Sequence, residues 1–129
     1  MKSPKPPYDM VRRFFQLAMG RQFAEAERVL GSIQSQMRDV EWSKGYLQAL
    51  KGIIQVRRTN HDRYAFISNL DMDDVNALME SHEEFVRHSK SRLHDVYDRG
   101  FFSAWADFMR FLLDLQDTRN EASKKINNP

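Results

Sequence analysis

The feature that most constrains the fold of this chain is a segment near its C-terminus that is apolar on almost every side. Residues 101–117 read FFSAWADFMRFLLDLQD, and their polar members recur at helical spacing, at Ser103, Asp107, Arg110, Asp114 and Asp117. A helix with such a narrow polar stripe must be covered on most sides. We therefore expect either the central helix of a bundle, with the stripe in solvent and Arg110 bridging its aspartates, or a helix with one face against a partner.

Apolar residues at intervals of three and four predict further helices ahead of this segment. Residues 8–19 and 23–37 each carry one apolar face, and the short junction at Gly20 predicts that they form an antiparallel hairpin. A third helix is expected over about residues 39–58. The positions that carry these three patterns are Tyr8, Val11, Phe15 and Ala18; Phe23, Ala26, Leu30, Ile33 and Met37; and Trp42, Tyr46, Ala49, Ile53 and Val56.

The third predicted helix contains glycines in its interior. Gly45 and Gly52 should each cost about 1 kcal/mol relative to alanine. Together with Ala49 they fall on one strip of the helix surface. We expect this strip to let a neighbouring helix, the second or the last, approach the backbone closely.

The pattern weakens between residues 59 and 73, where we expect a turn at 60–62 and either a short helix or an irregular segment at 63–70. Asp71 is the expected N-cap of a following helix that begins near residue 75, runs unbroken to Arg99 and is stopped by Gly100. The apolar side of this helix is expected to include Leu93 and Val96. Residues 1–6 and 119–129 lack apolar periodicity and are expected to be flexible. The sequence thus predicts one all-α domain over residues 1–129, with five to six antiparallel helices as stacked hairpins or a closed bundle.

Composition excludes several classes of protein. The 129 residues contain no cysteine, which excludes thiol nucleophiles and thiolate metal sites. The 20 basic and 18 acidic residues are nearly balanced, which disfavours a nucleic-acid partner. No apolar run approaches the roughly 20 residues that span a bilayer, and no apolar signal region follows the N-terminal lysines. We expect a cytoplasmic protein without cofactor, metal or membrane association.

Two stretches of the chain share an order of residues. Phe23, Ala26, Leu30 and Ile33 follow Gly20, and Phe101, Ala104, Phe108 and Phe111 follow Gly100. The two leading phenylalanines are 78 residues apart, which corresponds to two units of about 39 residues, a length typical of helical-hairpin repeats.

The stretch GRQFAEA, residues 20–26, resembles the turn and second-helix opening of tetratricopeptide repeats. Residues 8–33 would form a first hairpin of this kind and residues 93–113 a last one. In the first helix of this family, a small residue follows the tryptophan by four positions and an aromatic residue follows it by seven. In this chain Gly45 follows Trp42 by three positions and Tyr46 follows it by four, which departs from the family pattern. The resemblance implies a scaffold that binds peptides or proteins and has no reaction centre.

A second resemblance concerns the basic residues of the fourth clear helix. Arg87 followed by His94 is similar to the arginine and histidine spacing of small helical ribonucleases of the HEPN type, although His88 stands where that family often has a different polar residue. Glu84 and His88 lie one helical turn apart and could also contribute to a metal site, but ordinary pairing on a helix face explains them better. A ribonuclease or nucleic-acid-associated domain is therefore the alternative function.

The sequence favours a noncatalytic module for protein–protein interaction or self-association. The excess of apolar helix surface and the lack of a catalytic constellation both point this way. The expected partner is a protein or peptide, including a second copy of this chain as a homodimer. The expected partner-binding residues are Trp42, Tyr46, Trp105, Phe108 and Met109.

Overall fold

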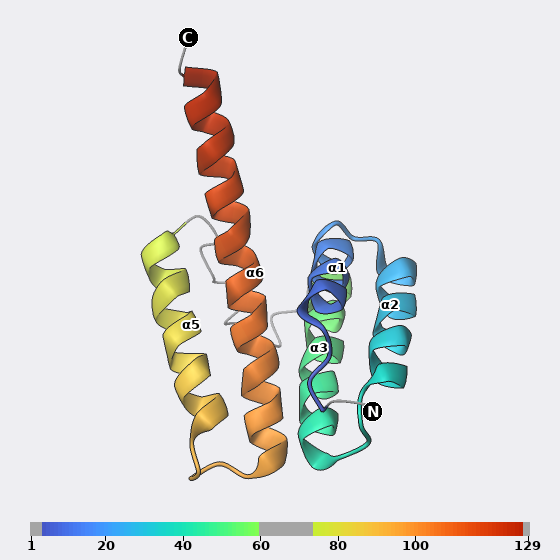
Figure 1. Cartoon of the computed structure of the whole chain (residues 1–129). Coiled ribbons are helices and arrows are strands. Elements are labelled where there is room, and N and C mark those ends of the chain that lie inside the picture. The colour runs from blue at the N-terminus through green and yellow to red at the C-terminus, as the bar shows by residue number, and fades with distance from the viewer. Residues whose placement is uncertain (1–3, 60–73, 128–129) are drawn as a thin grey trace.

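The computed structural model of the chain describes residues 4–59 and 74–127, without the side chains of residues 59 and 120–127. Its described elements are all α-helical, which confirms the predicted fold class (Figure 1). The helices are α1 (Tyr8–Met19), α2 (Phe23–Gln36), α3 (Glu41–Thr59), α5 (Val75–Lys90) and α6 (Val96–Asn127). Within the described ranges, no helix is both long enough and apolar enough to cross a bilayer.

Helix α6 is the centre of the molecule, as the narrow polar stripe predicts. It packs along α3 on one side and along α5 on the other, and it also touches α1 (Figure 1). Among its described side chains, seven apolar ones are buried, namely Ala104, Trp105, Ala106, Phe108, Met109, Phe111 and Leu112. Because α6 is covered by several helices, its wide apolar surface is satisfied within one chain.

Neighbouring helices along the chain run antiparallel where their connection is described. Helices α1 and α2 form the predicted hairpin, and α5 and α6 form another (Figure 1). Helices α3 and α6, which are not consecutive in the chain, run in the same direction (Figure 1).

Glycines allow α3 and α6 to cross with their backbones in contact. A Cβ atom on Gly45 would overlap the carbonyl group of Tyr97, and a Cβ on Gly100 would overlap the carbonyl group of Trp42. Each helix therefore contributes one glycine to the crossing. This confirms the prediction that the strip with Gly45 admits the last helix, whereas Gly52 is partly exposed.

The predicted role of Gly100 as a helix stop is wrong. Helix α5 ends at Lys90, residues 91–95 connect it to α6, and Gly100 is buried inside α6. The break has a local cause, because the carboxylate of Asp95 accepts a hydrogen bond of 2.8 Å from the backbone N–H of Asp98 and so starts a new helix. The order of residues shared after Gly20 and Gly100 therefore does not mark two equivalent turns.

The other helix ends also differ in detail from the sequence expectations. Asp74 is the N-cap of α5 and accepts a hydrogen bond from the backbone N–H of Ala77 at 3.1 Å. The expected N-cap Asp71 and the short helix expected at 63–70 lie outside the described residues.

The connection between α1 and α2 depends on more than its glycine. Gly20 has an ordinary negative φ, and the left-handed residue is Arg21, with φ of 60°. The guanidinium of Arg21 donates to the carbonyl of Arg57 at 2.9 Å and lies over the ring of Phe23. These contacts tie the turn to the end of α3 and hold Arg21 in its unusual backbone conformation.

The described parts of the two chain ends lie in different surroundings. Pro6 is buried, and the hydroxyl of Ser43 donates to the carbonyl of Pro4 at 3.2 Å. At the other end, α6 continues to Asn127, and its last turns project beyond the rest of the bundle (Figure 1).

Candidate functional site

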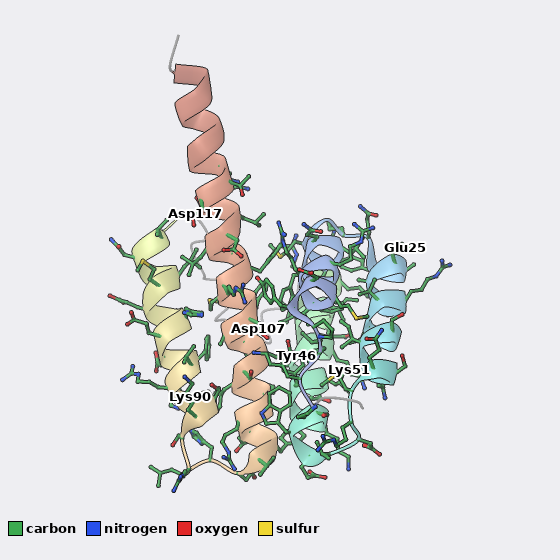
Figure 2. All side chains as sticks on the ribbon, in the orientation of Figure 1. Glu25, Tyr46, Lys51, Lys90, Asp107 and Asp117 are labelled. Carbon is green, nitrogen blue, oxygen red and sulfur yellow. The ribbon has the colours of Figure 1, made fainter. Side chains whose placement is uncertain are left out.

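A buried polar cluster occupies the junction of α1, α3 and α6. The hydroxyl of Tyr46 on α3 donates a 2.7 Å hydrogen bond to the carboxylate of Asp107 on α6, and Figure 2 shows both at this junction. The amino group of Lys5 lies 3.6 Å from the same carboxylate. Asp107 is only 7% exposed, so the expectation that the polar stripe of α6 faces solvent is wrong at this position. Asp107 can be buried because Tyr46 and Lys5 pair with the negative charge of its carboxylate.

The polar stripe continues from Asp107 to a contact with α1. The guanidinium of Arg110 lies 3.7 Å from the centre of the Tyr8 ring, and the Tyr8 hydroxyl donates to Asp114 at 3.4 Å. The expected bridging of Asp107 and Asp114 by Arg110 is replaced by this stacking on the face of Tyr8.

The surroundings of both tyrosines favour the neutral phenol. Burial, followed by the charge of Asp107 and the hydrogen bond to it, raises the pKa of Tyr46 well above its usual value. Burial and the charge of Asp114 raise the pKa of Tyr8 to about 12. The folded state therefore holds these protons more tightly than the unfolded state does. The associated stability is fully present below the unfolded pKa of about 10 and is lost as the pH rises above it.

We expect Tyr46→Phe to lower the free energy of unfolding by about 1.5–3 kcal/mol at neutral pH, because it removes the hydroxyl that satisfies a buried carboxylate. The deficit should shrink as the pH rises from about 9 to 11, where the parent loses the contribution of the tyrosine proton. Urea unfolding at each pH measures both effects. Tyr8→Phe is the matched comparison and should cost less, because its hydrogen bond is longer. An unchanged pH dependence in Tyr46→Phe would contradict this assignment.

Four of the five residues expected to bind a partner are buried in the core, and the fifth, Trp42, packs against it. Tyr46, Phe108 and Met109 are 0% exposed, Trp105 is 6% exposed, and Trp42 is partly buried. Their contacts are internal: Trp42 stacks on Tyr46 with ring centres 5.2 Å apart, and Phe108 lies 5.1 Å from Phe15 of α1. The structure therefore corrects the expected binding surface, because side chains that fill the α3–α6 interface are not available to a partner.

Among the described residues, the large apolar side chains that are exposed belong to the α5–α6 hairpin. Leu93 is 96% exposed and Val96 is 44% exposed, and both lie at the end where α5 connects to α6. Met79 is 48% exposed but lies near the other end of α5. Sequence reasoning missed Leu93 and Val96 because it placed both on the buried stripe of one unbroken helix. The signal that could have shown the break is Asp95 three residues before Asp98, a spacing at which a side chain can cap a helix.

The histidines at this end of the hairpin are brought together by the connection. His88 Nδ1 and His94 Nε2 are 2.9 Å apart, and Glu84 Oε1 lies 3.7 Å from His88 Nε2. The rings of His88 and His94 both contact Phe102 of α6, with centres 4.9 and 5.1 Å from it.

The two residues of the ribonuclease-like spacing have different surroundings. His94 faces His88, whereas Arg87 is exposed and lines an open hollow of about 530 Å³ with His82, Glu83 and Val86. The ribonuclease alternative stays a prediction. If the parent chain cleaves RNA and His94→Ala retains the full rate, the role predicted for His94 is excluded.

Among the described residues, no three histidine or carboxylate side chains are grouped so that they could hold a metal ion. No family model, curated protein or solved structure matches the chain.

Proposed function

We propose that the chain is a noncatalytic protein–protein interaction module that self-associates through the end of the α5–α6 hairpin. The observation that carries this proposal is the exposure of Leu93 and Val96, three positions apart where α5 connects to α6. Exposed apolar side chains gain free energy when a partner covers them. A cytoplasmic location belongs to the same proposal and is motivated by the lack of cysteine.

A second copy of the chain is the occupant that the charges around these residues favour. The connection and the adjoining helix ends carry Lys90 and Arg92 as well as Asp95 and Asp98. In a twofold dimer the same patch meets itself, so it must be complementary to itself. A patch with both signs of charge around an apolar centre meets that condition, whereas a patch of one sign would repel its copy.

Leu93→Glu tests this proposal without disturbing the core. We expect the parent chain to show a mass that rises with concentration towards that of a dimer, and Leu93→Glu to remain a monomer over the same range. The small apolar area implies weak association, with a dissociation constant of about 1 μM or higher. Light scattering coupled to size exclusion measures the mass.

Gln34→Glu is the matched control, because Gln34 is exposed on α2, on the other side of the molecule from α5 (Figure 1). It introduces the same charge and should leave the association unchanged. A parent chain that stays monomeric at every concentration, or a Leu93→Glu variant with the mass of the parent, would contradict self-association at this surface.

A further inference from the structure

The contact between His88 and His94 depends on how many hydrogens the two imidazole rings carry. Two imidazole nitrogens 2.9 Å apart are at hydrogen-bond distance, so one of them must carry a hydrogen and the other must offer a lone pair. A neutral pair satisfies this condition, and so does a pair with a single positive charge. When both rings are protonated, every ring nitrogen is a donor, and the contact becomes a repulsion between like charges.

The charges around the two rings differ, and a carboxylate lies near His88. Glu84, on the same helix, places its carboxylate 3.7 Å from His88 Nε2. His88 also lies in the last turn of α5, where the negative end of the helix dipole favours a cation. Arg87 and Lys90 in that turn oppose the charge, but both are exposed to solvent, which screens them.

His94 is in a different position, because it precedes the first turn of α6. The positive end of that helix disfavours a cation nearby. Of the neighbouring charges, Arg92 in the connection is exposed, and Asp95 already accepts the backbone N–H of Asp98. Phe102, the residue of α6 against which both rings pack, supplies no acceptor for a second proton.

We propose that His88 and His94 form a proton-operated latch on the α5–α6 connection. The latch is closed while at most one of the two rings is charged, with His88 Nδ1 donating to His94 Nε2, and it opens when both rings are charged. Opening frees residues 91–95 from the contact that joins the end of α5 to the start of α6. The proposal does not depend on self-association, although Leu93 lies on the same connection.

Nuclear magnetic resonance of the parent chain tests this proposal. Ring ¹⁵N shifts report which imidazole nitrogens carry hydrogens, and amide hydrogen exchange reports the opening of residues 91–95. At pH above 7 we expect His94 Nε2 to be without a hydrogen. On acidification to about pH 5, where imidazole is normally charged, exchange in the connection should become about three- to tenfold faster after correction for its intrinsic pH dependence.

His94→Gln is the decisive variant, because glutamine can accept from His88 through its amide oxygen and never becomes charged. It should keep the connection closed and remove the acid-induced opening. His82→Gln removes a histidine of α5 that is not part of the pair and should behave like the parent. The proposal is overturned if His94→Gln opens on acidification as the parent does, or if both parent rings become protonated while exchange at residues 91–95 stays unchanged. His88→Gln gives a second test of the same prediction from the other ring.

Discussion

Alanine at Gly45 should lower the free energy of unfolding by about 3 kcal/mol, although alanine is the better helix former. The added methyl group would overlap the carbonyl group of Tyr97 and would lie 3.1 Å from the backbone nitrogen of Phe101. These are backbone atoms inside α6, which cannot rotate away as the end of a side chain could. The two helices would have to separate, and the lost packing outweighs the gain of about 1 kcal/mol in helix propensity.

Gly31→Ala is the matched control for this substitution. Gly31 lies in α2, is exposed, and a Cβ atom there would meet nothing within 4 Å. Alanine should therefore raise the free energy of unfolding by about 0.5–1 kcal/mol, the opposite sign. Gly100→Ala should destabilise as Gly45→Ala does, because its Cβ would overlap the carbonyl group of Trp42. Urea unfolding measures all three, and a Gly45→Ala variant as stable as the parent would show that the helices do not cross in this way.

Phe108→Ala should lower the free energy of unfolding by about 3–5 kcal/mol. The Phe108 ring is fully buried, and its neighbours are the rings of Phe15, Trp105 and Phe111, with centres 5.1, 6.0 and 6.5 Å away. Alanine would leave a cavity between α1 and α6 that these large rings cannot fill without leaving their own contacts. The measurement is again urea unfolding, with near-ultraviolet circular dichroism to follow the packing of the aromatic rings.

Leu93→Ala is the matching substitution at an exposed apolar residue, and it tests binding where Phe108→Ala tests the core. Leu93 is 96% exposed, so its truncation should change the free energy of unfolding by less than about 0.5 kcal/mol while weakening any association. The opposite result, a stable Phe108→Ala variant that has lost association, would restore Phe108 to the partner-binding surface expected from the sequence.

Most of the secondary structure could be predicted because helical periodicity is a local property of the sequence. The spacing of Val11 and Phe15 in α1, or of Ala26, Leu30 and Ile33 in α2, identifies the buried face of each helix without knowledge of its neighbours. Helix ends were less predictable. The break between α5 and α6 depends on one capping carboxylate, Asp95, in a stretch whose apolar pattern continues on both sides.

The candidate surface could not be predicted because apolar character alone does not say which side chains are covered. Trp105 and Leu93 are both apolar residues on predicted helical stripes, yet one is 6% exposed and the other 96% exposed. The difference arises because Trp105 lies in α6, which packs against several helices, whereas Leu93 lies in the connection after α5 and is exposed in the part of the chain that the structure describes.

The sequence by itself determined that this chain is all-helical, that its last helix is central and that Gly45 admits a close neighbour. These properties follow from residue spacing along a single helix and from the size of single side chains. Only the tertiary structure decided that α6 is that neighbour, that Gly100 completes the crossing, that Asp107 is buried against Tyr46, and that His88 meets His94. The first three are contacts between residues far apart in the chain, and the last joins residues six positions apart across the α5–α6 connection. How the helices pack together decides which residues meet in each of them.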